Sequence, residues 1–454
     1  MEAQRLTSIK FIAVGEREEK IINRVQMLFS EIGYRLIDSD KSIYVEINDR
    51  LDEEFNFLQD DSLKLVAKNE RILFRSMVQL LIHSLLGEGL KVSSPNVNER
   101  CLMLDIGRKY YSLPILKSLV QVMALFNFTH LQLHFSENEG FRIESKKYPK
   151  IVSNHFLRQS EIKELIDYAQ KYYIEIIPDI DSPGHLAKVL QNYPEYQLMK
   201  LQENQLVRDK TALDILNPEA VEFVFSIYQE YANLFKQSKY FHIGADEFID
   251  FDKLEDYPTL VKEAQSKFGD KASGIELFIL YVNELIQKMN NLGFIVRVWN
   301  DGFYRLNREE KISLTSDCQI SYWTKWNKNM APIEKYLSLG YEVINHNDNY
   351  LYYVLGNNSS YTLPTYEKIQ ENFETLTFAN NQNIEKDNKN QVIGVALSVW
   401  ADEPNKQSCQ EICESLFYLL AAMNEKVSGY KLSKRCYLPL FNSWKKYVLG
   451  EITS

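Results

Sequence analysis

Two adjacent carboxylates, Asp246 and Glu247, come directly after a short apolar segment, residues 240–244. The aromatic and β-branched residues of that segment favour a β-strand. Gly244 and Ala245 carry little side-chain bulk and leave room beside the acids. In open solvent such a pair is a common loop feature. In a partly dry cleft, repulsion between the two charges raises the pKa of one acid, which suits it to donate a proton near neutral pH.

The acidic pair belongs to a regular alternation of strands and helices that begins at Cys101. Apolar segments predict eight strands, at residues 102–107, 130–136, 174–180, 240–244, 294–300, 319–323, 342–346 and 395–400. Helical patterns lie between most of them, as at residues 160–172 and 274–291, with Ser160 as an expected N-cap and Gly293 as an expected stop. Eight such units predict an α/β fold, a (β/α)8 TIM barrel.

Polar and indole side chains follow all eight predicted strands. Since the active sites of such barrels collect where the strands end, these side chains should converge on one face. The residues at the strand ends are Asp105, Arg108, His134, Glu137, Asp179, Asp181, His185, His242, Asp246, Glu247, Trp299, Asp301, Trp323, His346, Asn347, Tyr350, Trp400 and Asp402.

A different pattern precedes the barrel. Within residues 1–95, strand-like and helix-like segments predict a small α/β domain, and no concentrated polar cluster suggests chemistry there. Residues 93–98, which contain Ser, Pro and Asn, read as a linker. We therefore predict a non-catalytic domain over residues 1–95 and a catalytic barrel over residues 98–454.

The net charge and the cysteine content limit which binding partners and which cellular compartment are expected. The 454 residues carry a net charge of -10, which argues against nucleic acid or an anionic membrane as a partner. The five cysteines are scattered and odd in number, unlike a disulfide framework. The first residues lack a signal-peptide pattern, so we expect a cytoplasmic protein. The oligomeric state stays open.

Four ordered segments resemble the motifs of one family, the β-N-acetylhexosaminidases of glycoside hydrolase family 20. Residues 102–111 resemble its Asp-x-x-Arg segment, and residues 133–138 its His-Leu-Ser/Thr-Asp-Asp segment. Residues 177–185 are similar to Pro-Glu-Ile-Asp-x-Pro-Gly-His, and residues 242–247 to His-x-Gly-Gly-Asp-Glu. The resemblance spans the predicted barrel, and a small α/β domain often precedes it in this family.

The resemblance implies retaining, substrate-assisted hydrolysis of a terminal N-acetylhexosamine from an oligosaccharide or glycoconjugate. In this chemistry the sugar's own acetamide oxygen is the nucleophile and forms an oxazolinium ring. It also implies roles for the strand-end residues, with no metal and no organic cofactor. The catalytic set is Glu247 as acid/base, Asp246 as the carboxylate that orients the amide, His185 as a bridge between Glu247 and a second acid, and Glu137 as that acid. The substrate-binding set is Arg108, His134, His242, Trp299, Trp323, Tyr350, Trp400 and Asp402.

Within the second set, Arg108 would hold sugar hydroxyls, or would instead be a structural partner of Asp105. The three tryptophans would wall the acetamide pocket, Tyr350 would donate to the acetamide carbonyl, and Asp402 would bind outer hydroxyls.

The sequence departs from the family pattern at three positions. Glu137 replaces an Asp, Ala245 replaces the second Gly, and Tyr352 stands where the pattern after Tyr350 has an Asp. The last change removes one hydroxyl-binding carboxylate and leaves the preference at C4 and C6 open.

Three alternatives remain. One is a lacto-N-biosidase-like release of a disaccharide, and another is a non-catalytic sugar-binding barrel. The third is a metal-dependent hydrolase that uses His134, His185, His242, Asp246 and Glu247 as zinc ligands.

Overall fold

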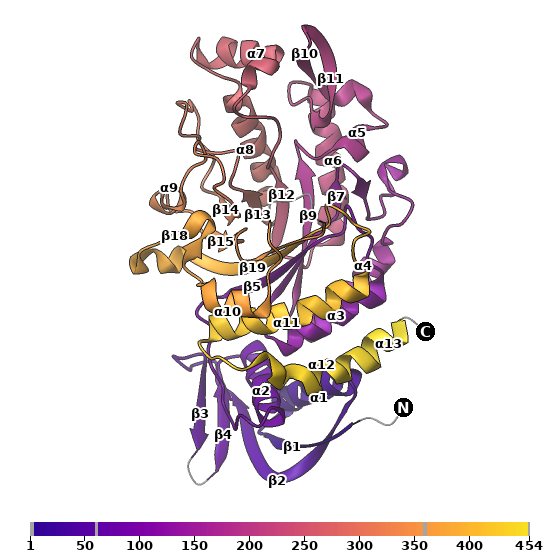
Figure 1. Ribbon diagram of the computed structural model, residues 1–454, viewed down its shortest axis with the longest axis vertical. Helices are drawn as coiled ribbons and strands as arrows, with labels where there is room; N and C mark the ends of the chain where they lie inside the picture. The colour runs from indigo at the N-terminus through magenta and orange to yellow at the C-terminus, as the bar shows by residue number, and fades with distance from the viewer. Residues whose placement is uncertain (1–3, 60–61, 357–360, 453–454) are drawn as a thin grey trace.

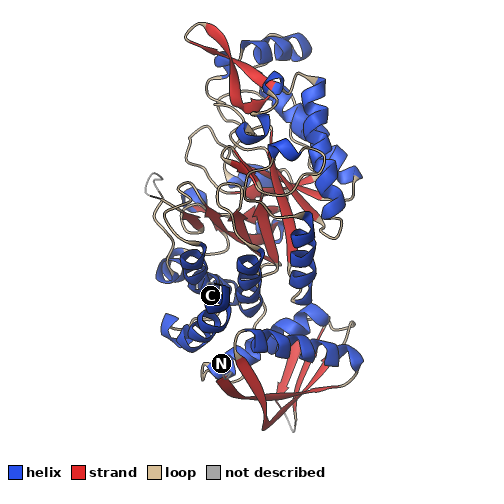
Figure 2. Ribbon diagram, turned by 90° about the vertical axis from the view of Figure 1, so that its right-hand side faces the viewer, coloured by secondary structure: helices blue, strands red, loops and turns tan. Residues whose placement is uncertain are grey.

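The first domain of the computed structural model is a four-stranded sheet with two helices on one face. The structure describes residues 4–59, 62–356 and 361–452. The elements are β1 (Gln4–Ala13), α1 (Glu16–Glu31), β2 (Tyr34–Ile47), β3 (Phe55–Gln59), β4 (Leu63–Ala67) and α2 (Glu70–Leu85). The strand order is β1-β2-β4-β3, and only β3, which the sequence did not predict, runs antiparallel to its neighbour. The helices lie between this sheet and the barrel (Figure 2).

Eight parallel strands close into the predicted TIM barrel (Figure 1). They are β5 (Glu99–Asp105), β6 (His130–His134), β9 (Glu175–Ser182), β12 (Tyr240–Gly244), β13 (Ile295–Trp299), β14 (Cys318–Tyr322), β15 (Val343–Asn345) and β19 (Val392–Trp400). Pairing of β15 with β19 closes the ring, and β16 (Tyr352–Val354) adds to β19 outside it. All eight predicted strands are present, with ends shifted by up to three residues.

Helices alternate with the barrel strands as predicted. The longer ones are α3 (Leu113–Leu125), α4 (Gln159–Lys171), α6 (Pro218–Leu234), α7 (Pro258–Phe268), α8 (Ile275–Asn291) and α11 (Cys409–Ser428). Shorter elements fill the loops, namely β7 (Ser136–Glu137), β8 (Gly140–Phe141), α5 (Ala187–Leu190), β10 (Gln197–Gln202), β11 (Gln205–Leu213), α9 (Ile333–Ser338), α10 (Tyr366–Asn372), β17 (Thr377–Phe378) and β18 (Gln382–Asn383). None of the described helices is long and apolar enough to cross a membrane.

The structure confirms the expected helix end at Gly293 but not the expected N-cap at Ser160. Gly293 follows α8 with φ of 95°, a backbone angle that glycine adopts without strain. The expectation for Ser160 is wrong, because α4 already begins at Gln159 and Arg158 is its N-cap. The carboxylate of Glu161 accepts from the backbone N–H of Arg158, so a first-turn acid caps the helix without a Ser N-cap.

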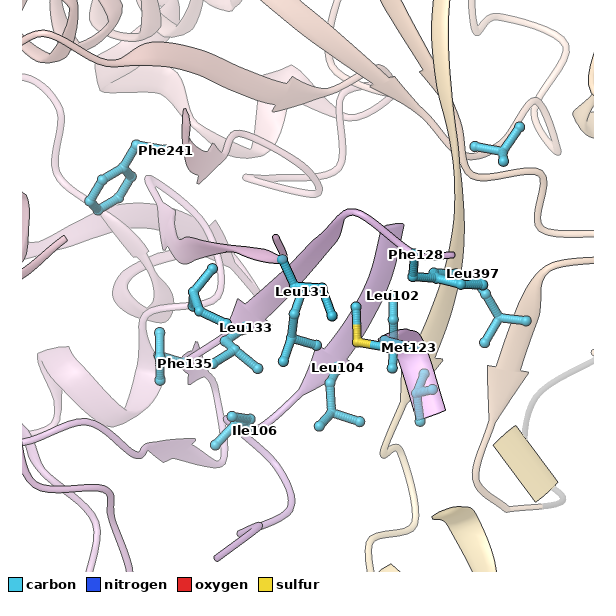
Figure 3. Packing of buried hydrophobic residues seen from close by; sticks show 14 of the residues in the cluster. Leu102, Leu104, Ile106, Met123, Phe128, Leu131, Leu133, Phe135, Phe241 and Leu397 are labelled. Atoms are coloured by element: carbon cyan, nitrogen blue, oxygen red, sulfur yellow. The ribbon is translucent and has the colours of Figure 1, made fainter. Parts of the chain in front are cut away.

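Alternation along each strand separates an apolar outer layer from a polar interior. In β5 and β6 the outward residues Leu102, Leu104, Leu131 and Leu133 pack with Met123 of α3 (Figure 3). The intervening residues point into the barrel, since successive strand side chains face opposite sides. A small apolar layer of Cys101, Ile344 and Ala396 forms inside. Most polar residues of the motifs stand on inward positions and gather at the two ends of the interior.

The C-terminal helices α12 (Leu438–Trp444) and α13 (Gly450–Ile452) return to the first domain (Figure 1). The Tyr34 hydroxyl donates to the carbonyl of Pro439, and the Ser443 hydroxyl donates to the carbonyl of Ile32. A side chain at Gly33 would collide with the ring of Tyr447. The ends of the described chain are therefore packed against each other, although they belong to different predicted domains.

Candidate active site

A cavity of about 560 Å3 opens at the carboxyl end of the barrel strands. Loops after several strands contribute its walls, as predicted for this fold. The lining residues are Arg108, Glu137, His185, Asp246, Glu247, Trp299, Trp323, Trp326, Asp348, Asn349, Tyr352, Val354, Tyr361, Trp400 and Asp402. Nine of the twelve predicted site residues line it; His134, His242 and Tyr350 do not.

A chain of charged contacts links Arg108 to Glu247 through Glu137 and His185. Arg108 Nη2 lies 2.5 Å from Glu137 Oε1, and His185 Nδ1 lies 3.0 Å from the same oxygen. On the other side of the ring, His185 Nε2 lies 3.4 Å from Glu247 Oε2 and 3.6 Å from Asp246 Oδ2. The longer Glu137, in place of the family's Asp, still reaches His185. The predicted bridge between Glu247 and a second acid is therefore present.

Arg108 forms the structural ion pair that was one predicted alternative, and it also lines the cavity, as the sugar-binding alternative requires. Its Nη1 lies 3.0 Å from Asp105 Oδ2, which is a structural ion pair. Its guanidinium also lines the cavity and comes within 4.0 Å of Asp402 Oδ1, whose side chain is 44% exposed. The ion pairs with Asp105, Glu137 and Glu139 engage all three nitrogens of the guanidinium and fix it in the cavity wall.

The turn after β12 directs the acidic pair into the cavity. Gly244, Ala245 and Glu247 all have positive φ, of 74°, 67° and 41°. A Cβ on Gly244 would collide with Asp181 Oδ1, so the close approach inferred from sequence is real. Asp301 holds the turn from the next strand, because its Oδ2 accepts from the backbone N–H of Glu247 at 3.0 Å. Strained backbone of this kind is typical of functional sites.

The pKa shifts of the two acids in the pair are opposite to our expectation. Burial and the nearby charge of Asp181 raise the pKa of Asp246 well above its usual range. The adjacent imidazole of His185 lowers the pKa of Glu247, whose side chain is 52% exposed. We predicted Glu247 as the neutral acid and Asp246 as the anion. The two pKa shifts run the other way, because Asp246 is the more buried acid and Glu247 lies closer to His185.

A second row of charges lies beneath the cavity floor. His134 Nδ1 is 3.1 Å from Asp179 Oδ2, and His242 Nδ1 is 3.4 Å from Asp179 Oδ1. The predicted contact of His134 and His242 with substrate is wrong, because both are fully buried inward residues below the cavity. Burial and the charge of Asp179 raise the pKa of Asp181 to about 7. Neither oxygen of Asp181 has a hydrogen-bond partner among the described residues.

Two overlapping groups could in principle hold a metal ion. His134, Glu137 and Asp181 form one, and Asp181, His185 and Asp246 form the other, with ligand atoms within 4.8 Å in each. The carboxylates around His134 and His185 outweigh burial and raise the pKa of both imidazoles. His242 and Glu247, which the zinc alternative also requires, belong to neither group.

Aromatic side chains make the cavity walls. Trp323 stacks on Tyr352 with ring centroids 5.8 Å apart, and Trp299 lies 6.0 Å from Trp400. The indole N–H of Trp323 donates to Asp301 Oδ1 at 3.1 Å, so Asp301 fixes both this wall and Glu247. The indole nitrogens of Trp299 and Trp400 have no hydrogen-bond partner among the described residues. The site thus offers apolar faces together with uncommitted donors.

Tyr350 is not where we predicted it. It lies before β16, and its hydroxyl donates to Asn381 Oδ1 at 3.0 Å. Tyr352, two residues later, lines the cavity instead. We had considered Tyr352 only as a missing Asp. Sequence reasoning also missed Asp348, Tyr361 and Trp326, which line the cavity from loops outside the four motifs.

Comparisons with known proteins agree with the resemblance. The model of "Glycosyl hydrolase family 20, catalytic domain" matches residues 98–427. A lacto-N-biosidase of Bifidobacterium bifidum is 29% identical over 274 residues, which are 60% of this chain and 24% of that protein. Beta-hexosaminidase subunit A1 of Dictyostelium discoideum is 23% identical over 371 residues, 78% of this chain and 66% of that protein. The chain thus spans less than two thirds of the length of these relatives.

A solved structure supports the fold. The GH20 exo β-N-acetylglucosaminidase of Vibrio harveyi, in complex with N-acetylglucosamine, has a TM-score of 0.74 at 19% identity. The match covers 96% of this chain and 74% of that one, so it includes the small first domain as well as the barrel. Taken with the matched family model, the barrel and its acidic pair, this shows that the chain belongs to glycosyl hydrolase family 20 and carries that family's catalytic domain.

Proposed function

We propose that this protein is an exo-acting β-N-acetylhexosaminidase that removes terminal GlcNAc or GalNAc from oligosaccharides or glycoconjugates with retention of configuration. The observation that carries the proposal is the pair Asp246–Glu247 on a single turn, with both side chains in one aromatic-walled cavity and both beside His185. A pure sugar-binding site has no need for a proton donor that is coupled to an imidazole.

In the proposed first step, the acetamide oxygen of the sugar attacks its own anomeric carbon. The bond from that carbon to the leaving oxygen breaks, and Glu247 transfers a proton to the leaving oxygen. Asp246 accepts a hydrogen bond from the acetamide N–H and stabilises the positive charge of the oxazolinium ring. Water then attacks the anomeric carbon while Glu247 takes its proton, which restores the acetamide and the enzyme. An internal nucleophile has an effective molarity of up to ~10⁵–10⁸ M, and the acid contributes roughly 10²–10⁴-fold.

Substrate binding would move the proton from Asp246 to Glu247. The acetamide N–H would hydrogen-bond the ionised form of Asp246 and so lower its pKa. The sugar would also displace water from the half-exposed Glu247 and so raise the pKa of that carboxyl. His185 lies within 3.6 Å of an oxygen of each acid, so it is a direct route for the exchange. The unliganded proton distribution is then the resting state of the pair.

The remaining lining residues would bind and orient the terminal sugar. Arg108 and Asp402 would take outer hydroxyls at the rim. Tyr352 would replace Tyr350 as the hydroxyl that meets the acetamide carbonyl, because it is the one that lines the cavity. The indole faces would pack against the sugar ring and the acetyl methyl group.

The decisive experiment compares nitrophenyl β-glycosides of GlcNAc, GalNAc and glucose. We expect turnover of at least one N-acetylhexosaminide and none of the glucoside, because the glucoside lacks the internal nucleophile. An oxazoline-mimicking thiazoline should inhibit, and less strongly in Asp246→Asn. Equal cleavage of the glucoside would refute substrate assistance.

Three further measurements separate the alternatives. Release of an intact disaccharide from a nitrophenyl lacto-N-bioside, without cleavage of the monosaccharide substrates, would favour a lacto-N-biosidase-like activity. Complete loss of activity on chelation, with recovery on added zinc, would favour the metal-dependent hydrolase. Binding of N-acetylglucosamine without turnover of any of these compounds would favour a sugar-binding barrel.

A further inference from the structure

A small cavity lies between α2 of the first domain and the amino-terminal end of the barrel. Its volume is about 10 Å3. Arg71 and Arg75 of α2 line one side, and Asn127 and Thr129, from the loop that enters β6, line the other. Tyr172 and Tyr173, which follow α4, complete it. We call this the interdomain cavity; it is separate from the active-site cavity, which opens at the opposite end of the barrel.

The cavity is lined by hydrogen-bond donors that have no acceptor. Arg75 Nε and Asn127 Nδ2 have no hydrogen-bond partner among the described residues. Arg75 is 6% exposed and Asn127 is 7% exposed, so bulk water does not satisfy these N–H groups. An unpaired buried donor destabilises the fold. Among the residues that the structure describes, no Asp or Glu lines the cavity.

Positive charge accumulates around the same place. Arg100 is 1% exposed and donates only to the carbonyls of Val97, Asn98 and Asn127 among the described partners. Burial, together with the charges of Arg75 and Arg71, lowers the pKa of Arg100 well below its usual range. The three guanidiniums therefore lie within each other's field.

The nearby carboxylates are already bound elsewhere. Glu54 pairs with Arg75 at 2.6 Å, and Glu99 pairs with Arg297 at 2.7 Å. Glu175 accepts from the Ser238 hydroxyl and from the backbone N–H of Lys239. The described residues thus leave the charges of Arg71 and Arg100 without a carboxylate at ion-pair distance.

We propose that the interdomain cavity binds one small monoatomic anion, such as chloride, and that this ion joins the two domains. A cavity of this size has room for at least one water-sized sphere, so a single monoatomic anion fits it. Water fits the size but not the chemistry, because it must donate its own two hydrogens and the unpartnered lining atoms are both donors. An anion accepts from Arg75 and Asn127 together and offsets the neighbouring guanidinium charge.

Thermal unfolding of the full chain tests this proposal at constant ionic strength, with sodium gluconate replaced stepwise by sodium chloride. A bound ion that is absent from the unfolded chain stabilises the fold in proportion to the logarithm of one plus its concentration over Kd. We expect Tm to rise by a few degrees with chloride. A Tm that does not respond to chloride would refute the proposal.

Asn127→Asp provides the matched variant. Asn127 has φ of 62°, a conformation that Asp also tolerates, so the variant places a fixed carboxylate among the same donors. Its Tm should no longer depend on chloride. Asn204→Asp, at an exposed residue with φ of 61°, is the control and should keep the dependence of the parent chain. Equal chloride dependence in all three proteins would show general screening only and would overturn the proposal.

Crystals grown with sodium bromide give a readout that needs no variant. We expect an anomalous bromide peak between Arg75 Nε and Asn127 Nδ2. Density without anomalous signal at that place would identify water and would refute the anion.

Discussion

The barrel interior holds two sets of buried charges, one at each end, and they are built in opposite ways. At the amino-terminal end, Glu99 and Arg297 form a two-pronged pair with both distances 2.7 Å, and Gln319 accepts from Arg297 Nε at 2.9 Å. Burial opposes the charge of Glu99, but Arg297 outweighs it and lowers the pKa of Glu99 to about 2.

At the carboxyl end the charges are not fully paired. Oxygens of Asp179, Asp181 and Asp246 and the Nε2 of His185 have no hydrogen-bond partner among the described residues. Burial raises the pKa of Asp181 to about 7 and, with the charge of Glu247, raises that of Asp301 to about 6. Buried charges that are fully paired hold one protonation state and serve the fold. Buried charges left unpaired can exchange protons and are available to a substrate.

The largest expected effect is at the carboxyl end. Glu247→Gln removes the proposed acid and should lower kcat on N-acetylhexosaminides by roughly 10²–10⁴-fold, with little change in Tm because the side chain is half exposed. Steady-state kinetics with phenyl substrates of different leaving-group pKa measures the loss, which should shrink as the leaving group becomes more acidic. Glu255→Gln, at an exposed surface acid, is the control. A loss below tenfold would contradict the assignment.

At the amino-terminal end of the barrel, a substitution should lower the stability of the fold rather than the activity. Arg297→Met leaves Glu99 buried and unpaired, which should cost about 3–5 kcal/mol of unfolding free energy. The ordinary pKa of Glu99 is 4.5 and its folded value is about 2. The contribution of the pair is therefore complete above pH 4.5 and fades as the pH falls towards 2. Urea unfolding at several pH values measures it.

The double variant Glu99→Leu with Arg297→Met should regain much of the lost stability, because no lone buried charge remains. If Arg297→Met instead altered the pH–rate profile of the folded enzyme, the two ends of the barrel would not be separate.

A smaller effect should distinguish two neighbouring tyrosines. Tyr352→Phe removes a hydroxyl proposed to meet the acetamide, which at about 0.5–1.5 kcal/mol for one hydrogen bond lowers kcat/KM by roughly 3–10-fold. Tyr350→Phe removes a hydroxyl that donates to Asn381 outside the cavity and should leave kcat/KM unchanged. Steady-state kinetics of both variants on the same substrate measures the difference. A loss of kcat/KM in Tyr350→Phe alone would support the role first predicted for Tyr350.

The smallest effect should come from Asp181→Asn. The folded pKa of Asp181, about 7, exceeds its ordinary value of 3.8, so the native carboxylate lowers stability as the pH rises from 4 to 7. The amide imitates the protonated acid. The variant should equal the parent near pH 4 and become increasingly more stable than the parent as the pH rises to 7. Thermal unfolding from pH 4 to 8 measures the difference. A gain that does not change with pH would show that Asp181 is not a titrating group.

The fold and most of the site followed from sequence because period-two alternation records which side of a strand faces the interior. Nine of the twelve predicted site residues line the cavity. The four motifs contain Arg108, Glu137, His185, Asp246 and Glu247, and the ends of later strands supply Trp299, Trp323, Trp400 and Asp402. The depth of a residue below the cavity does not follow from this alternation. His134 and His242 share the inward side with cavity residues, and alternation does not say how far below the surface they stop.

The error at Tyr350 has a related cause. Tyr350 and Tyr352 are two residues apart, and a strand would place both on one side. The chain instead turns at Tyr350, whose backbone N–H donates to the carbonyl of Asn347, and β16 begins only at Tyr352. The raised pKa of Asp246 was also beyond prediction from sequence, because it depends on how deeply the carboxyl is buried and on how close Asp181 lies.

The packing of α12 onto the first domain has a consequence for biosynthesis. The hydrogen bond from Tyr34 to Pro439 spans 405 positions, and translation proceeds at roughly 5–20 residues per second. The nascent amino-terminal domain therefore waits on the order of tens of seconds for its last packing partner to leave the ribosome. Throughout that interval the backbone at Gly33, against which the ring of Tyr447 packs in the folded chain, has not yet received that ring.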